Sequence, residues 1–138
     1  MKRELFVDTS AWYALADADD QHHHSAEVFL AQALKIYTRL VTSNSVVGET
    51  YTLIRTRLGY REAWEFITRV RSSSRLEIIF TNESIESEAY RLLRQFQDQD
   101  FSYVDGTSFA LMKERKMTEA FAYDKHFLTA GFIKLPHV

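Results

Sequence analysis

The sequence predicts a single α/β domain with a mainly parallel sheet and helices on both of its faces. The chain has 138 residues, of which 46% are hydrophobic, which is enough for one domain with a substantial core. Short apolar runs alternate along it with longer helical patterns, as in strands joined by right-handed crossover helices. Four glycines and one proline leave few helix breakers, so we expect long helices with short connections in one domain over residues 1–138.

The expected strands are short apolar runs that end in polar residues. The first run, Leu5-Phe6-Val7, is apolar throughout, as in a strand buried on both faces. Thr9 or Ser10 is expected to cap the helix that follows. The expected strands cover residues 5–7, 40–42, 76–80, 120–123 and, at the sheet edge, 132–135.

The expected helices lie between these runs. A core stripe recurs at helical spacing in the third helix, and Gly59 suits the end of that helix. The stripe consists of Val47, Tyr51, Ile54 and Leu58. The expected helices cover residues 11–16, 25–37, 46–58 with a cap at 43–45, 61–70, a segment from 81–83 to 96, a segment after Asp105, and 125–130.

The composition excludes several classes of protein. There are no cysteines, which excludes disulfide frameworks, thiolate zinc sites and cysteine nucleophiles. The net charge is −2, so any nucleic-acid affinity must come from local patches. The apolar runs are far shorter than the ~20 residues that span a bilayer, and Asp8 lies where a signal peptide would be apolar. We therefore expect a soluble cytoplasmic protein.

Acidic residues lie where the carboxyl ends of the predicted strands are expected. Asp8 and Asp124 each follow a strand directly. Asp105 opens a helix, and Glu49 lies about one turn into the helix after the second strand. Because parallel strands end at one edge of their sheet, four carboxylates would converge there if these strands are neighbours.

A cluster of four carboxylates requires a cation, because neighbouring negative charges repel one another and raise each other's pKa. Mg²⁺ and Mn²⁺ prefer oxygen ligands, and they activate water and stabilise phosphoryl transition states. Each acid also has a simpler explanation. Asp8, Asp105 and Asp124 could be helix N-caps, and Glu49 lies opposite the core stripe, where exposure to solvent is the default. The strand-end placement of the set favours a metal site.

Four segments of the chain resemble the signature blocks of PIN-domain nucleases. They keep the family's order and spacing from residue 6 to residue 136, and the closing residues are similar to the tail of VapC-type toxins. Gly106 and Tyr123 differ from the residues frequent at their positions, but neither removes a carboxylate. The segments are Phe6-Val7-Asp8-Thr9-Ser10, Val47-Gly48-Glu49, Phe101-Ser102-Tyr103-Val104-Asp105-Gly106-Thr107-Ser108-Phe109 and Ala122-Tyr123-Asp124-Lys125-His126-Phe127, with Ala130-Gly131-Phe132 and Leu135-Pro136 at the end.

This resemblance implies a PIN-like three-layer α/β/α sandwich and a metal-dependent endoribonuclease that uses Mg²⁺ or Mn²⁺. It also implies an RNA substrate, a cognate antitoxin of the VapBC type and a homodimer. The positions that match the metal-binding and catalytic acids are Asp8, Glu49, Asp105 and Asp124, and the polar positions that match residues lining the site are Thr9 and Ser108.

Histidines are a further possible source of ligands. His22-His23-His24 cannot all face one metal from a helix, because neighbours point about 100° apart, so an exposed loop is expected there. His126 is a candidate substrate or proton contact, although a surface or capping role is favoured.

Charge and aromatic residues are unevenly distributed. Six arginines and two glutamates lie between residues 54 and 75, whereas residues 76–105 carry two arginines and seven acids. The basic segment is either a phosphate-tracking surface or an ordinary solvated helix face, and the two explanations are equally supported. The aromatic residues of the early helices are expected to form a partner-binding groove or a dimer face, and Trp12, Tyr13 and Phe29 favour the dimer.

Two other functions are consistent with a single α/β domain. A receiver-like phosphoacceptor domain also has acids at strand ends, but it needs an aspartate after the third strand, where this chain has Phe80-Thr81-Asn82. A catalytically inactive PIN-fold binding module would have no reason to keep four repelling carboxylates.

Overall fold

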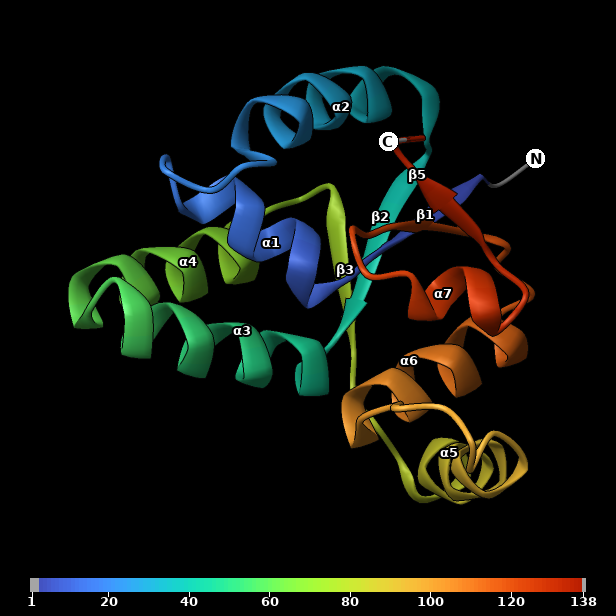
Figure 1. Ribbon diagram of the computed structural model, residues 1–138. Helices are drawn as coiled ribbons and strands as arrows, with labels where there is room; N and C mark the ends of the chain where they lie inside the picture. The colour runs from blue at the N-terminus through green and yellow to red at the C-terminus, as the bar shows by residue number, and fades with distance from the viewer. Residues whose placement is uncertain (1–2, 138) are drawn as a thin grey trace.

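The computed structural model describes residues 3–137, which fold around one sheet of five parallel strands (Figure 1). The strand order is β3-β2-β1-β4-β5, and all four neighbouring pairs are parallel. The expected α/β class is therefore confirmed. The strands are β1 (Glu4–Val7), β2 (Arg39–Ser43), β3 (Leu76–Ile79), β4 (Glu119–Phe121) and β5 (Ile133–Leu135).

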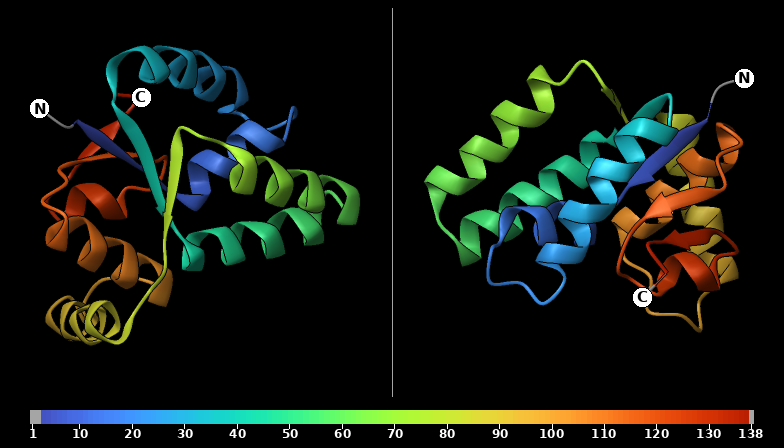
Figure 2. Two further views of the ribbon diagram at one scale, coloured as in Figure 1. Left: turned by 180° about the vertical axis from the view of Figure 1, so that it is seen from behind. Right: turned by 90° about the horizontal axis from the view of Figure 1, so that it is seen from above.

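Seven helices cover the two faces of the sheet and complete the expected three layers. Helices α1 to α4 lie to one side of the sheet and α5 to α7 to the other (Figures 1 and 2). None of the helices in residues 3–137 has the length and apolar character that crossing a bilayer requires. The helices are α1 (Thr9–Ala16), α2 (His23–Ile36), α3 (Asn44–Arg57), α4 (Tyr60–Ser72), α5 (Glu83–Gln95), α6 (Tyr103–Glu114) and α7 (His126–Thr129).

Successive residues of β1 pack on opposite faces of the sheet, as the two-residue repeat of a strand requires. Leu5 and Val7 pack with α1 and α2, whereas Phe6 packs with α5 and α6. All three side chains are fully buried. Burial on both faces explains why this strand is an uninterrupted apolar run in the sequence.

The first helix begins earlier than expected, because its cap is Asp8 rather than Thr9 or Ser10. The Asp8 side chain accepts a hydrogen bond from the backbone N–H of Ser10, and the helix starts at Thr9. An N-cap of this kind satisfies a backbone donor that the first helical turn leaves free. The capping explanation offered for Asp8 is thus correct, and it does not exclude a role at the site.

The strand expected over residues 120–123 ends at Phe121, two residues early. The backbone N–H of Tyr123 donates to the Ser10 hydroxyl (2.9 Å) instead of to a neighbouring strand. The chain therefore leaves the sheet before it reaches Asp124.

The helix expected after Asp105 begins earlier, as α6. Ser102 is its N-cap, and Asp105 lies in its first turn.

The core face of α3 is broader than the predicted stripe. Three residues of this helix are fully buried because it packs against α1 and α6 as well as α4. The fully buried residues are Val46, Thr50 and Ile54, whereas the other predicted positions, Val47, Tyr51 and Leu58, are half-buried.

Helix α2 begins at His23, two residues before the expected start, and contains two of the three consecutive histidines. His23 Nδ1 donates a hydrogen bond to the carbonyl of Ala14 (2.8 Å), and the ring of His22 stacks on Tyr123 with ring centres 4.2 Å apart. The expected exposed loop is therefore wrong for His23 and His24, of which only His24 is exposed. The rings of His22 and His23 face different partners, so the triplet holds no common ligand position.

Replacing Gly48 with alanine is expected to stabilise the protein by about 0.5–1 kcal/mol, because glycine in a helix interior is less favourable than alanine. Gly48 is exposed in α3, and a Cβ added there would meet no atom within 4 Å. Urea unfolding measures the change. Gly131→Ala is the control and should destabilise, because Gly131 has a φ of +98°. A loss of stability in Gly48→Ala would contradict the helical environment described here.

Candidate active site

The acidic site lies where the order of the strands reverses. The chain passes from β1 outward through β2 to β3, and then returns to the other side of β1 to form β4 and β5. Such a switch point leaves a crevice beyond the carboxyl ends of the two central strands. Asp8 directly follows β1, Asp124 lies three residues beyond the end of β4, and the first turn of α6 places Asp105 beside them.

Asp8 is the most buried of the acids, with only 4% of its surface exposed. Its Oδ2 accepts hydrogen bonds from the backbone N–H (3.1 Å) and the hydroxyl (2.7 Å) of Ser10. The pKa of Asp8 is raised to about 7, mainly by burial and to a smaller extent by the charges of Asp105 and Asp124, while the two hydrogen bonds from Ser10 oppose the shift. Asp8 therefore lies within electrostatic reach of both other aspartates.

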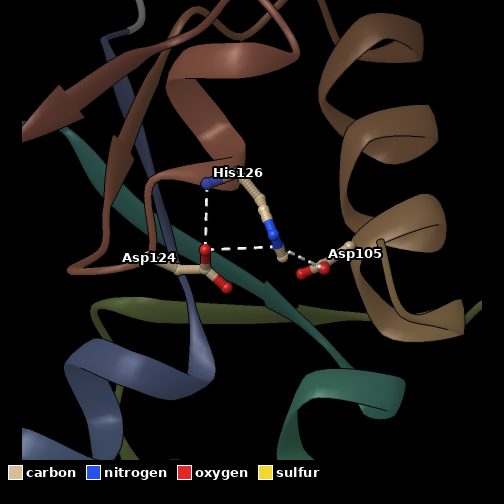
Figure 3. A group of neighbouring side chains, drawn as sticks. All are labelled: Asp105, Asp124 and His126. Atoms are coloured by element: carbon tan, nitrogen blue, oxygen red, sulfur yellow. Dashed lines mark hydrogen bonds and ion pairs between the residues drawn. The ribbon is translucent and has the colours of Figure 1, made fainter. Parts of the chain in front are cut away.

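Asp105, Asp124 and His126 meet in front of the sheet (Figure 3). His126 Nδ1 lies 3.0 Å from Asp105 Oδ2 and 3.3 Å from Asp124 Oδ1. One ligand atom from each of the three residues lies within 4.8 Å of the others. Burial is the main cause of a raised pKa at Asp105, and the charge of Asp124 adds to it, while hydrogen bonds from Ser102 and His126 oppose it.

Glu49 does not join this cluster. It is exposed on α3, as its position opposite the core stripe predicted, and no hydrogen bond or ion pair joins it to the aspartates among the described residues. It instead lines an open groove of about 750 Å³ that runs along α3 and also reaches Thr9, the neighbour of Asp8. Glu49 thus borders the groove that leads away from the cluster.

The two polar residues expected to line the site are both buried. The hydroxyl of Thr50 donates to Thr9 Oγ1 at 3.3 Å. Ser108 lies one turn beyond Asp105 on α6, and it is fully buried. Within residues 3–137 its hydroxyl is the sole buried side-chain nitrogen or oxygen without a hydrogen-bond partner. An orphaned buried hydroxyl is unusual, since such groups are normally satisfied by protein, water or ligand.

The sequence of residues 5–133 matches the family model described as the PIN domain. The chain belongs to the PIN domain family. A curated relative, the 23S rRNA-specific endonuclease VapC20 of Mycobacterium tuberculosis, is 35% identical over 131 residues, which are 95% of this chain and 97% of that protein.

Several solved structures share the fold of this chain. The crystal structure of M. tuberculosis VapC20, named a Sarcin-Ricin loop cleaving toxin, matches with a TM-score of 0.87 and covers 94% of this chain and 96% of its own. VapBC2 from Rickettsia felis, bound to a promoter DNA fragment, matches with a TM-score of 0.70 at 16% identity, covering 95% of this chain and 96% of that one. FitAcB from Neisseria gonorrhoeae matches with a TM-score of 0.69 at 15% identity, covering 97% of this chain and 99% of that one. At these lower identities the likeness shows the fold alone.

The acidic set of this PIN domain fits a hard divalent cation. Carboxylate oxygens are the ligands that Mg²⁺ and Mn²⁺ prefer, and a cation would offset the burial and the mutual repulsion that together raise the pKa of Asp8 and Asp105. Ser108, whose hydroxyl has no hydrogen-bond partner among residues 3–137, lies one turn beyond Asp105 on the same helix.

The contact of His126 with the acids differs from the sequence expectation. A surface or capping role was favoured, but only 18% of the side chain is exposed and its ring touches two aspartates. The available signal was its position two residues after Asp124. There the backbone N–H of His126 donates to Asp124 Oδ1 (2.9 Å) in a tight turn, which brings the ring back over the carboxylate.

Proposed function

We propose that this protein is a metal-dependent endoribonuclease and the toxin of a VapBC-type toxin–antitoxin system. The observation that carries the proposal is the set of three coupled aspartates, Asp8, Asp105 and Asp124, at the switch point of a PIN domain. It is supported by 35% identity, over nearly the whole chain, to a relative named as an rRNA-specific endonuclease. We place its activity in the cytoplasm, where a ribosomal RNA substrate is found.

The residues that would hold Mg²⁺ or Mn²⁺ are Asp8, Asp105 and Asp124. Such an ion lowers the pKa of a bound water and offsets charge on the phosphodiester in the transition state. Ser10 fixes the Asp8 carboxylate with two hydrogen bonds. Ser102 donates its backbone N–H to Asp105 Oδ2 (3.0 Å) and so orients the second carboxylate.

Glu49 and the two lining residues have supporting roles in this proposal. Glu49 is exposed beside the groove and is free to orient the attacking water from the substrate side. Thr9 lines the same groove next to Asp8, and its buried hydroxyl is joined to Thr50 of α3, so it would help to hold the wall of the groove that faces the RNA. Ser108 keeps a hydroxyl for a ligand of the site, because nothing else in the described chain satisfies it.

Metal dependence is tested by incubating the purified protein with RNA that contains the sarcin–ricin loop of 23S rRNA, in Mg²⁺, Mn²⁺ or EDTA. Cleavage is expected with either cation and should be lost in EDTA, because the uncompensated carboxylates repel the phosphate. An unrelated RNA of equal length controls for specificity. Cleavage that persists in EDTA would contradict the metal mechanism.

The proposed protein partner is a cognate antitoxin. Two solved structures whose fold this chain shares, VapBC2 from Rickettsia felis and VapBC from Salmonella typhimurium, carry the VapBC name. An apolar cleft of about 360 Å³ between α1, α2 and α4 gives this chain a surface for a partner segment. The cleft is lined by Trp12, Leu15, Leu30, Leu34 and Phe66, among others.

A homodimer remains a prediction, although the residues that suggested it pack within the protomer. Tyr13 is buried, Trp12 packs edge-on against Phe66, and Phe29 packs edge-on against Phe121. Light scattering of the protein without antitoxin is expected to give about twice the 16.2 kDa of one chain. A particle of one chain at micromolar concentration would contradict the dimer.

The basic segment between residues 54 and 75 is a candidate path for RNA away from the site. All six of its arginines are exposed, but Arg55 lies over the ring of Tyr60 and Arg57 over that of Tyr13. Arg75 donates to backbone carbonyls of Leu34 and Tyr37. Arg61 lies 3.8 Å from Glu65, so Arg69 and Arg71 are the residues best placed to contact phosphate.

The receiver-like alternative conflicts with the topology. Receiver-type domains have the strand order 2-1-3-4-5, whereas this chain has the order 3-2-1-4-5. The cleavage assay distinguishes an enzyme from a catalytically inactive PIN-fold binding module, because the inactive module would cleave no RNA.

A further inference from the structure

We propose that Nδ1 of His126 is a direct ligand of the divalent cation at Asp105 and Asp124, which makes the centre a mixed nitrogen–oxygen site that favours Mn²⁺ over Mg²⁺. The inference deepens the proposed function, since it takes the acidic cluster as a metal centre. It requires metal binding and does not require RNA cleavage.

The spacing of the three atoms supports a shared ion. Nδ1 of His126 lies 3.0 Å from Asp105 Oδ2 and 3.3 Å from Asp124 Oδ1 (Figure 3). In an octahedral site with ligand distances of about 2.1 Å, adjacent ligands lie about 3.0 Å apart. The imidazole nitrogen therefore already occupies a position adjacent to both carboxylates, as one ligand lies beside another.

The position of the ring is fixed by its surroundings. The backbone N–H of His126 is held by Asp124 Oδ1 at 2.9 Å. The ring packs edge-on against Phe101, with ring centres 5.1 Å apart, and 18% of the side chain is exposed. A nitrogen held in this way loses little conformational entropy when it binds an ion.

If a cation occupies the site, His126 cannot act only as a hydrogen-bond donor to the carboxylates. Nδ1–H donates to Asp105 Oδ2, which also accepts the backbone N–H of Ser102, and Nδ1 lies 3.3 Å from Asp124 Oδ1. If these oxygens bind a cation, a proton between them would face that positive charge. Turning the nitrogen lone pair to the ion removes the conflict and adds a ligand.

The nature of the ligand sets the metal preference. Mg²⁺ binds carboxylates and water and rarely accepts nitrogen, whereas imidazole suits transition metals, and their affinity for nitrogen rises from Mn²⁺ onward. A site with only Asp8, Asp105 and Asp124 would distinguish the two ions weakly. A site that includes His126 should bind Mn²⁺ clearly more tightly.

Pulsed electron paramagnetic resonance of the full-length protein with Mn²⁺ tests the proposal directly. The wild-type spectrum is expected to show coupling to a coordinated imidazole ¹⁴N, which changes to the ¹⁵N pattern when histidine is labelled. Absence of coordinated nitrogen, or of Mn²⁺ binding at millimolar concentration, would overturn the proposal. This arm uses the wild-type protein, so it does not depend on whether a variant folds.

His126→Asn separates a ligand from a positioning residue, because the asparagine amide keeps an N–H donor near the place of Nδ1. The coupling should disappear, and Mn²⁺ affinity measured by calorimetry should fall at least about tenfold, with a much smaller change for Mg²⁺. His24→Asn, at an exposed histidine of α2, is the matched control and should change neither. Unchanged Mn²⁺ affinity in His126→Asn would assign the histidine to positioning and overturn the proposal. A wild-type protein that shows the nitrogen coupling but cleaves no RNA would confirm the ligand and reject the proposed function.

Discussion

Asp8→Asn is expected to abolish RNA cleavage while the protein remains folded. Asparagine has nearly the same size and still accepts the hydrogen bonds from Ser10 that cap α1, but it removes one negative charge from the three coupled aspartates. A weaker hold on the cation raises the barrier to phosphodiester cleavage. A loss of about 4 kcal/mol of transition-state stabilisation corresponds to a rate about a thousandfold lower.

The measurement is the initial rate of RNA cleavage in Mg²⁺ or Mn²⁺, together with circular dichroism to establish folding. Asp98→Asn makes the same chemical change at an exposed position after α5 and should cleave at the wild-type rate. In cells, Asp8→Asn should relieve the growth inhibition expected of the toxin, whereas Asp98→Asn should not. Wild-type cleavage by Asp8→Asn would remove Asp8 from the mechanism.

The sequence was sufficient to predict the layers of the fold because its strands are buried on both faces. Leu5-Phe6-Val7 has no polar residue to face solvent, and the structure places its side chains in two separate cores. Ends of elements were harder to predict, because they depend on tertiary contacts. Tyr123 leaves the sheet to bond Ser10, a residue 113 positions earlier in the chain, and no local pattern encodes that contact.

The candidate site was predictable to the extent that strand ends position it. The placement of Asp8 and Asp124 after strands was visible in the sequence, and the structure places Asp124 beside Asp105, with the charges of both raising the pKa of Asp8. Glu49 was included because its helix begins at the carboxyl edge of the sheet and because of the family resemblance, since its helical position gives it no periodic signal. His126 was discounted, since a turn that folds its ring over Asp124 also requires Phe101 from a distant segment to pack against it.

The stability of the metal-free protein is expected to fall as the pH rises from 4 to 7. Asp8 has a pKa of about 7 in the folded protein and an ordinary value of 3.8, so between these values the folded state binds a proton that the unfolded state has lost. Stability decreases with pH wherever the native state holds more protons. The shift corresponds to as much as about 4 kcal/mol, which is fully present below pH 4 and is lost by the time the pH passes 7. The raised pKa of Asp105 acts in the same direction.

Two carboxyl groups outside the site affect the free energy of unfolding in a lower range of pH. Salt bridges lower the pKa of Glu77 and Glu119 below the ordinary 4.5, so the stability they provide is lost only as the pH falls below that value. The interval from pH 5 to pH 8 therefore lies above the range in which Glu77 and Glu119 titrate. Urea unfolding in EDTA should show a decreasing free energy of unfolding across this interval.

Asp8→Asn and added Mn²⁺ should each flatten this pH dependence, for two different reasons. The substitution removes the titrating group, so the variant in EDTA should exceed the wild type in stability at pH 8 by several times the difference seen at pH 5. The cation stabilises the ionised carboxylates, and it should restore wild-type stability at pH 8 but have a much smaller effect on Asp8→Asn. Asp98→Asn should behave as the wild type in both conditions. A wild-type protein whose stability in EDTA is constant or rises from pH 5 to pH 8 would show that Asp8 is ionised when no metal is bound. Groups of the protein other than a metal would then offset the effect of burial on the pKa of Asp8 at the β1/β4 switch point.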